Sequence, residues 1–322
     1  MTPTQLKPAK RRLRRSFGRG GRATPRPSGR GQKASLSSVT AGKHPKLKII
    51  PLGGMEEVGK NMTVFEYGND IVILDMGLKF PEEDQHGIDY IIPNISCLKG
   101  KEKNVRAVIF SHGHLDHIGA SPILLARLGY PTIVGRPLTL AMVKHRQEDY
   151  EPKSSNRLKT ITIKSLSDRF SFGAFRVAFF QIEHSIMDAV GVILETPAGS
   201  VIHPGDWTLE RDARSGNPIV DYRHLARVKR PSILMLESLG AIDVRKSGTQ
   251  DEMKKNLETL IRTASGRIII GTFASQIERI GWIIQAAERL NKKVALDGYS
   301  MKMNIEIATT FGYIKARKGT LI

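Results

Sequence analysis

The stretch SHGHLDHIGA, residues 111–120, places three histidines and one aspartate within six residues. It follows the apolar run VRAVIF, residues 105–110, which is typical of a buried β-strand. The chain has nine histidines, so a third of them lie in this one loop. Neutral imidazole nitrogen and carboxylate oxygen are ligands that zinc accepts in proteins. A solvated polar turn is the alternative for such a loop, but these residue types at this spacing favour a metal site.

The spacing within the loop indicates two metal positions. Side chains alternate sides along an extended segment, so His112 and His114 can point the same way. A turn after Leu115 would then direct Asp116 and His117 toward a second position. The run therefore predicts two adjacent metals rather than one.

Three further residues of ligand type follow apolar strands elsewhere in the chain. Asp75 ends VILD, His184 ends QIEH, and Asp206 ends VIHPGD. Loops at the edge of a sheet commonly carry functional residues, although each of these residues alone is also typical of a turn. Together with residues 112–117 they predict one site assembled from four loops.

The elements that must position these loops indicate a sheet-rich, layered α/β domain. Its predicted strands and helices precede Thr249. The predicted strands cover 46–52, 62–67, 70–77, 105–110, 131–135, 175–184, 189–196, 199–206 and 232–238, and the predicted helices cover 118–129 and 137–150.

From Thr249 the pattern changes to alternating helices and strands, which predicts a doubly wound parallel unit. The predicted helices cover 249–264, 275–290 and 303–312, and the predicted strands cover 266–273 and 293–298.

Length and composition bound the remaining possibilities. A chain of 322 residues is long enough for two domains with a sizeable core. It has no apolar run near the roughly 18 residues that a membrane helix needs, so we expect no membrane partner. The single cysteine, Cys97, excludes an internal disulfide and fits a reducing compartment. The net charge is +19, and 14 basic residues with no acidic ones lie in the first 50 residues.

Residues 1–45 form a leader rich in Arg, Gly, Pro and Ser, which we expect to be disordered. Arg-Gly segments bind RNA through phosphate neutralisation and guanidinium stacking, and the candidate residues here are Arg11, Arg12, Arg14 and Arg15. An organellar transit peptide is also Arg-rich and acid-poor, but the many Gly and Pro residues argue against an amphipathic helix. A tail that only solubilises the chain is the third interpretation.

The set of candidate ligands resembles that of the metallo-β-lactamase fold. The stretches LGGMEEVGKNMTVFEYGNDIVILDMG, HSIMDAVGV, GDW and GRIIIGTFASQIERI are more closely similar to ribonuclease J, a family of bacterial RNA-processing enzymes. The resemblance begins near Leu47 and extends to the end of the chain. It implies an αββα sandwich over 46–247, and over 248–322 the start of an inserted, doubly wound β-CASP domain.

The resemblance implies a role for each candidate residue. Asp116 and His117 would act in catalysis as ligands, and Glu237 would be the acidic residue at the edge of the site. Asp75 would orient the histidine loop. In the family pattern one Zn²⁺ is held by His112, His114 and His184, the second by Asp116 and His117, and Asp206 bridges the two. Hydroxide formed from water between the two Zn²⁺ ions would attack the scissile phosphorus.

The activity that the resemblance implies is 5′–3′ exoribonuclease with internal cleavage as a second mode, in RNA decay and rRNA maturation. The substrate would be single-stranded RNA with a 5′ monophosphate, for which Ser275 and Arg279 are candidate contacts; a helix cap is the alternative for Ser275. The family further implies a homodimer or homotetramer, partners in an RNA-decay complex, and a location in the bacterial cytoplasm. An organelle is the alternative location if the leader is a transit peptide.

The chain departs from the family pattern in three places. The mildest is Trp207, which stands where Phe is usual. Ser238-Leu239-Gly240 stands where family members carry Ser-Thr-Asn, and the chain stops at Ile322 before the family's downstream histidines. We therefore expect the 322-residue chain alone to be poorly folded or weakly active. The alternatives are a DNA-processing β-CASP nuclease, another hydrolase of the same fold acting on thioesters or lactones, and an inactive RNA-binding fragment.

Overall fold

The computed structural model describes residues 45–212, 215–243 and 248–322. The candidate residues Arg11, Arg12, Arg14 and Arg15 lie outside this part of the chain. None of the described helices is long and apolar enough to cross a membrane.

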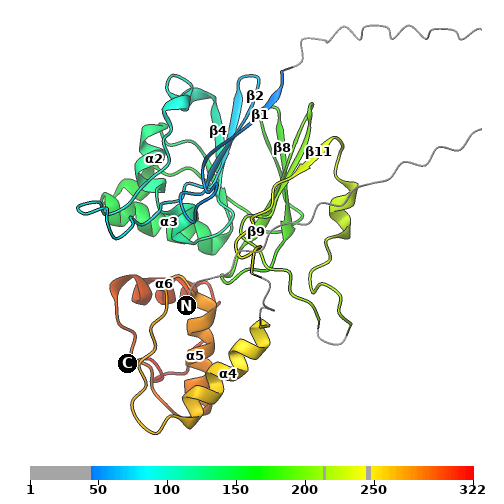
Figure 1. Ribbon diagram of the computed structural model, residues 1–322. Coiled ribbons are helices and arrows are strands. Elements are labelled where there is room, and N and C mark those ends of the chain that lie inside the picture. Colours follow the sequence, from blue (N-terminus) through cyan, green and yellow to red (C-terminus); the bar gives the residue numbers. More distant parts are fainter. Residues whose placement is uncertain (1–44, 213–214, 244–247) are drawn as a thin grey trace, which may run out of the picture. The chain divides into compact units, whose positions relative to one another are not determined.

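Eleven strands and six α-helices are formed by the described residues (Figure 1). The strands are β1 (Leu47–Gly53), β2 (Met62–Tyr67), β3 (Asp70–Leu74), β4 (Val105–Ile109), β5 (Ile133–Gly135), β6 (Thr160–Thr162), β7 (Arg169–Phe172), β8 (Phe175–Gln181), β9 (Val190–Thr196), β10 (Gly199–His203) and β11 (Ser232–Leu234). The helices are α1 (Leu115–Ile118), α2 (Ser121–Arg127), α3 (Pro137–Tyr150), α4 (Gln250–Thr263), α5 (Ile277–Arg289) and α6 (Tyr299–Thr310).

The first sheet has six strands in the order β1-β2-β3-β4-β5-β6. The first three strands pair antiparallel, and β3 to β6 pair parallel. Strands β3 and β4 are buried along most of their length, as their runs of Val, Ile and Leu require. The carboxyl ends of these parallel neighbours meet at one edge of the sheet, and this edge brings Asp75 and the histidine loop together.

The second sheet has five strands in the order β11-β10-β9-β8-β7. All its neighbours pair antiparallel except β10 and β11, which pair parallel. His184 follows β8 and Asp206 follows β10, so both residues lie in loops that leave this sheet.

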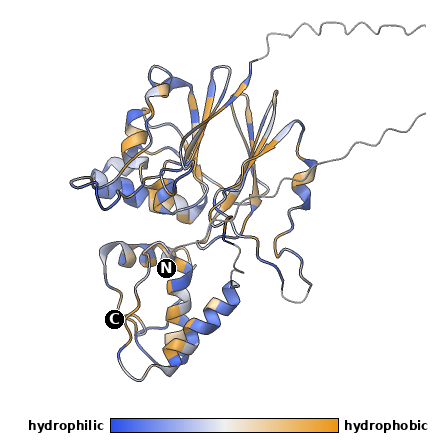
Figure 2. Ribbon diagram, in the orientation of Figure 1, coloured by the Kyte–Doolittle hydropathy of each residue, from blue (hydrophilic) through white to orange (hydrophobic). Residues whose placement is uncertain are grey.

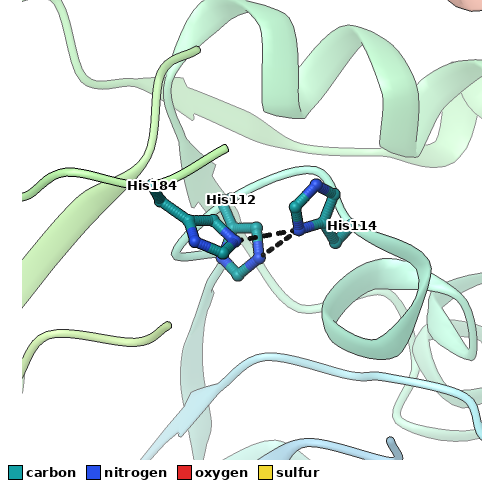
Figure 3. Close-up of side chains that lie close together, drawn as sticks. All are labelled: His112, His114 and His184. Atoms are coloured by element: carbon teal, nitrogen blue, oxygen red, sulfur yellow. Dashed lines mark hydrogen bonds between the residues drawn. The ribbon is translucent and has the colours of Figure 1, made fainter. Parts of the chain in front are cut away.

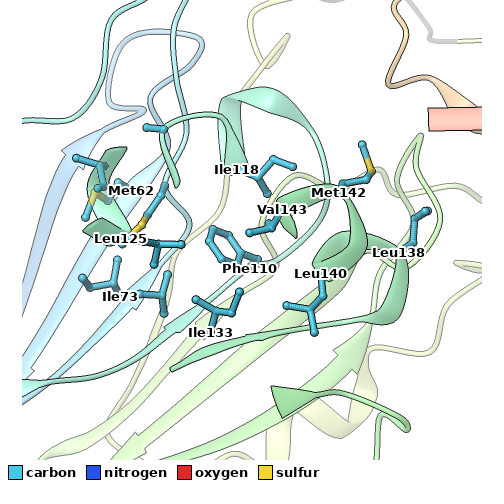
Figure 4. Packing of buried hydrophobic residues seen from close by; sticks show 14 of the residues in the cluster. Met62, Ile73, Phe110, Ile118, Leu125, Ile133, Leu138, Leu140, Met142 and Val143 are labelled. Carbon is cyan, nitrogen blue, oxygen red and sulfur yellow. The ribbon is translucent and has the colours of Figure 1, made fainter. Parts of the chain in front are cut away.

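Two apolar layers hold the sheets and helices together. Between the sheets, Phe65 and Ile109 from the first sheet belong to the same buried cluster as Phe175 and Val192 from the second. On the other face of the first sheet, a second cluster contains Phe110 together with residues of α2 and α3 (Figure 4). The predicted layered α/β architecture is therefore confirmed. The second sheet's outer face packs Phe180, Ile193 and Ile202 against residues around a 3₁₀ turn at Arg223–Arg227.

Residues from Thr249 onward form helices α4, α5 and α6, each close to its predicted range. Thr249 caps α4: its side chain accepts from the backbone of Glu252, and the Glu252 side chain accepts from the backbone of Thr249. Most of α4 carries hydrophilic colours, whereas the strands of both sheets carry hydrophobic ones (Figure 2). Only Ile261 of α4 is buried.

The predicted strands 266–273 and 293–298 are wrong for the described residues. Neither segment joins a ladder; the second makes one isolated bridge, between Val294 and Leu321. Ile269 and Phe273 are 92% and 76% exposed. A strand exists only where a neighbouring strand completes its hydrogen bonds, so the apolar pattern alone predicts strand without forming one here.

Candidate metal centre

The histidine loop begins where strand β4 ends. Phe110 is fully buried, and its N–H still bonds to the Val134 carbonyl of the neighbouring strand, at 2.8 Å. The next residues, Ser111 and His112, are also fully buried although they are polar. Buried polar groups need hydrogen-bond partners, so these side chains must be satisfied within the site.

Asp75 supplies most of those partners. It sits directly after β3 with φ +62°, a left-handed conformation that Asp tolerates better than most residues. Its Oδ1 accepts from the Ser111 N–H at 2.8 Å, and its Oδ2 accepts from the Ser111 hydroxyl at 2.8 Å. The same Oδ2 lies 2.8 Å from Nδ1 of His117. One buried carboxylate therefore fixes both the start and the end of the histidine run.

The segment after Asp75 runs beside the segment that carries Asp116 and His117. The Met76 N–H bonds to the His117 carbonyl at 2.7 Å, and the Leu78 N–H bonds to the Leu115 carbonyl at 3.1 Å. A Cβ on Gly77 would lie 1.5 Å from the Asp116 carbonyl oxygen. Only glycine allows the two backbones to approach this closely.

His112, His114 and His184 form the first ligand group. Nδ1 of His114 lies 3.0 Å from Nε2 of His112 and 3.0 Å from Nε2 of His184 (Figure 3). All three nitrogens lie within 4.8 Å of one another. His184 reaches the group from the loop between β8 and β9, whereas the other two leave the end of β4.

The protonation of this group fits a metal cation. The Ser111 hydroxyl donates to Asp75, so it accepts from Nδ1 of His112 at 3.0 Å. Nε2 of His112 then carries a lone pair, which faces Nδ1 of His114. Facing nitrogens at this distance need a cation or a proton between them, and a metal satisfies all three rings at once.

The rings of the first group are held in the neutral form that binds metals. Burial lowers the pKa of His112 well below its usual range, and the neighbouring imidazoles lower it further. Burial, with a contribution from His184, lowers the pKa of His114 to about 3. Burial lowers the pKa of His184 to about 4. At neutral pH all three side chains therefore offer nitrogen lone pairs.

His112, His117 and Asp206 form the second ligand group. Nε2 of His117 lies 3.2 Å from Oδ1 of Asp206 and 3.6 Å from Oδ2 of Asp116. Asn61 extends its Nδ2 to Asp116 Oδ2, at 3.3 Å, and to His117 Nε2, at 3.1 Å. The predicted ligands Asp116 and Asp206 thus both lie close to Nε2 of His117. His112 belongs to both ligand groups, whereas Asp116 belongs to neither.

Negative charge dominates the second group. Burial alone would lower the pKa of His117, but Asp75 and Asp206 raise it well above its usual range. Burial alone would raise the pKa of Asp206, but the hydrogen bond and charge of His117 lower it to about 2. Burial raises the pKa of Asp116, and His117 opposes that rise. Several carboxylates around one imidazole create a negative potential, and a bound metal ion would neutralise it.

The second group opens onto a cleft with a volume of 550 Å³. Asp116, Asp206 and Asn61 line it, and so does Glu237, whose Oε2 accepts from the Leu239 N–H at 2.6 Å. The remaining lining comes from residues 54–59, 236, 238–240 and 242. The structure therefore brings the candidate Glu237 into the same cleft as two of the candidate ligands.

Three residues of the site were not predicted: Asn61, Ser111 and His203. Asn61 contacts two candidate ligands, and Ser111 links Asp75 to His112. Nδ1 of the half-buried His203 accepts from the Gly205 N–H at 3.0 Å, which shapes the turn leading to Asp206. Burial of the ring lowers the pKa of His203 to about 4. Ser111 and His203 could have been found because they lie close in sequence to predicted ligands. Nothing in the sequence around Asn61 indicates that it reaches the site.

The two candidate RNA contacts of the C-terminal segment do not line the cleft of Asp116 and Glu237. Ser275 lies in the turn before α5, and the helix cap is Gln276, so the cap interpretation of Ser275 is wrong by one residue. The Arg279 guanidinium lies 3.3 Å from Sδ of Met253.

Comparison with known proteins defines the family. The sequence matches the metallo-beta-lactamase superfamily over residues 55–245, more than half of the chain. It matches the family described as ribonuclease J, beta-CASP domain, over residues 265–322.

Curated relatives include ribonuclease J of Corynebacterium glutamicum, 36% identical over 278 residues, which cover 86% of this chain and 38% of that protein. Ribonuclease J of Thermus thermophilus is 38% identical over 288 residues, which cover 86% of this chain and 49% of that protein. The chain thus spans half or less of the length of these relatives.

Among solved structures, a protein of unknown function from Enterococcus faecalis superposes with a TM-score of 0.58 at 17% identity, covering 86% of this chain and 73% of that one. At this identity the likeness concerns the fold alone. The predicted fold class is confirmed by the two family matches. The chain belongs to the metallo-β-lactamase superfamily, and its C-terminal part matches the β-CASP domain of ribonuclease J.

Proposed function

We propose that this chain belongs to a metal-dependent ribonuclease that hydrolyses phosphodiester bonds of RNA. The observation that carries the proposal is the pair of ligand groups that share His112. The second group opens onto the cleft that Glu237 also lines. The name ribonuclease J, which the curated relatives share, supports RNA as the substrate.

Two Zn²⁺ ions are the cofactors we assign. When bound, two such ions acidify water and stabilise negative charge on phosphate oxygens. We assign His112, His114 and His184 to the first ion, Asp116 and His117 to the second, and Asp206 to both.

The other residues of the site hold these ligands in place and handle protons. Asp75 accepts from Nδ1 of His117, which leaves Nε2 of that ring free to bind a metal. Ser111 does the same for His112, because its hydroxyl oxygen accepts from Nδ1 and leaves Nε2 free. Glu237 extends the acidic lining of the cleft beyond the ligands, and we assign it proton transfer at a reacting oxygen.

The substrate we propose is single-stranded RNA with a 5′ monophosphate, degraded from its 5′ end with internal cleavage as a second mode. Ser275 and Arg279 remain candidates for the 5′ phosphate, and Arg11, Arg12, Arg14 and Arg15 for backbone phosphates. This activity would serve RNA decay and rRNA maturation in a bacterial cytoplasm. We propose that the enzyme acts as a homodimer or homotetramer and that it binds other proteins of an RNA-decay complex. The concentration of basic residues in the first 50 positions supports contact with a polyanion.

The test compares matched RNA and DNA. The 322-residue chain, loaded with Zn²⁺, is incubated with a 5′-monophosphorylated oligoribonucleotide and the oligodeoxyribonucleotide of the same sequence. We expect weak cleavage of RNA, in line with the low activity expected of the 322-residue chain alone, and no cleavage of DNA. The double variant Asp116→Ala with His117→Ala should lose cleavage and keep salt-sensitive RNA binding. His224→Ala, an exposed histidine outside the site, should behave as wild type. Cleavage that survives the double variant would refute the proposal.

A further inference from the structure

Asp188 is a buried carboxylate that lies four residues after His184. Its side chain is 2% exposed, and its backbone has φ +65°. Oδ1 accepts from the Arg136 guanidinium at 3.1 Å, and Oδ2 accepts from the Leu138 N–H at 2.9 Å. Leu138 lies in the first turn of α3, so its N–H has no hydrogen-bond acceptor within the helix. Asp188 therefore fastens its loop to the start of α3.

The loop that carries Asp188 is also tied to the histidine run at two points. Ile186 is buried, and a Cβ on Gly113 would lie 3.4 Å from its Cδ1. The Val190 N–H bonds to the Ser111 carbonyl at 3.0 Å. A shift of this short loop would therefore move His184 relative to the other two histidines of its group.

Tyr313, which follows α6, supplies a further contact to Asp188. Its hydroxyl donates to Oδ1 of Asp188 at 2.6 Å. Burial and this hydrogen bond raise the pKa of Tyr313 to about 12, so the hydroxyl keeps its proton. Tyr313 lies within the β-CASP match at 265–322, whereas Asp188 lies within the metallo-β-lactamase match at 55–245. One hydrogen bond therefore joins the two matched segments at a residue four positions after the candidate ligand His184.

Side chains from both segments also line one pocket beside the ligand. His184 and Asp188 line a pocket of 350 Å³, together with Gln250 and Glu278. The last two residues come from α4 and α5. The C-terminal segment thus shares a pocket with His184 and contacts its loop through the hydrogen bond from Tyr313 to Asp188.

We infer that Tyr313 and Asp188 are positioning residues for His184, through which the C-terminal segment sets the metal affinity of the His112–His114–His184 group. The inference rests on the metal centre of the proposed function. Asp188 holds the loop to α3 through the Leu138 N–H. The hydrogen bond from Tyr313 fixes the Asp188 carboxylate and so stabilises the left-handed backbone of Asp188. Loss of the Tyr313 hydroxyl would leave the Asp188–Arg136 pair intact and loosen the loop.

The test measures Zn²⁺ affinity by competition with a chromophoric chelator, using the 322-residue chain. His184→Ala identifies which binding step belongs to the first group. We expect Tyr313→Phe to weaken that step by about 3- to 10-fold and Asp188→Asn by about 10- to 100-fold, with the other step unchanged. Tyr299→Phe is the matched control, because the Tyr299 hydroxyl likewise donates to an aspartate, Asp149 on α3, but the bond lies away from the His184 loop.

Each outcome decides the matter. Weakening by Tyr313→Phe without weakening by Tyr299→Phe supports the inference. Equal affinity of Tyr313→Phe and wild type overturns the inference and leaves the proposed metal centre standing. Equal weakening by both tyrosine variants also overturns it, because the effect would then reflect general stability. Absence of Zn²⁺ binding by wild type would overturn the proposed function and this inference together.

Discussion

Oδ2 of Asp75 lies 2.8 Å from Nδ1 of His117, although 42 residues separate the two in sequence. Both side chains are buried, and the hydrogen bond turns Nε2 of His117 toward Asp206. The same carboxylate binds Ser111 through both of its oxygens. Asp75 is therefore the residue on which the orientation of both ligand groups depends.

Replacement of Asp75 should weaken metal binding without removing a ligand. We expect Asp75→Asn to lower Zn²⁺ affinity by about 10- to 100-fold, because an amide holds the His117 ring less firmly than a carboxylate. Chelator competition measures the change. Asp70→Asn is the control: Asp70 begins β3, at the opposite end of the strand from Asp75, and binds Arg106 and the Ala174 N–H. It should cost stability but leave Zn²⁺ affinity intact; equal affinity of both variants would contradict this role of Asp75.

A side chain at position 77 should unfold the region around the histidine loop. Gly77→Ala would place its Cβ 1.5 Å from the Asp116 carbonyl oxygen, a contact that only a backbone shift relieves. We expect it to lower the free energy of unfolding by about 3 kcal/mol or more, measured by urea denaturation. At Gly266 a Cβ would meet nothing within 4 Å, so Gly266→Ala should change stability by less than about 1 kcal/mol. Similar values for the two variants would count against the close approach described here.

The free energy of unfolding should depend on pH through the carboxyl group of Glu66. Hydrogen bonds from Lys101 and Lys48 lower the pKa of this buried carboxyl below the model-peptide value of 4.5. A carboxyl whose pKa is lower in the folded state stabilises the fold above its unfolded pKa, and the stabilisation disappears as the pH falls through the folded pKa.

Glu66→Gln should therefore lower the free energy of unfolding at pH 7 by about 1–2 kcal/mol. Its deficit should shrink as the pH falls below 4.5. Urea denaturation across pH 3–7 measures both effects, with the exposed Glu306→Gln as the control. A deficit that persists unchanged at the lowest pH would show that Glu66 acts through packing instead.

The sequence predicted the candidate ligands because ligand-type residues follow apolar strands at each site loop. His112, His184 and Asp206 each lie three residues after the end of a strand, namely β4, β8 and β10, and the sheet edges bring these loops together. Helix α3 was predicted with its observed limits, since Pro137 marks its start and no breaker follows before Glu151.

Other features depend on contacts that local sequence does not encode. Asn61 reaches the site only because Gly77 and the backbone of Asp116 pair with its segment. The short strands β6 and β7 were not predicted, because their few residues carry little periodicity and their neighbours define them. The predicted strands 266–273 and 293–298 failed for the complementary reason, since apolar pattern without a ladder partner does not make a strand.

Zinc stoichiometry tests the central claim most directly, because the claim is that the site holds two Zn²⁺ ions, with His112 as a ligand of the first. The metal is removed from the chain with a chelator, the chain is reconstituted with Zn²⁺, and unbound metal is removed. The zinc bound per chain is then measured by atomic emission spectroscopy. We expect two Zn²⁺ per wild-type chain, two for the His224→Ala control, and at most one for His112→Ala. A wild-type chain that retains no zinc, or a His112→Ala variant that retains two, would contradict the account.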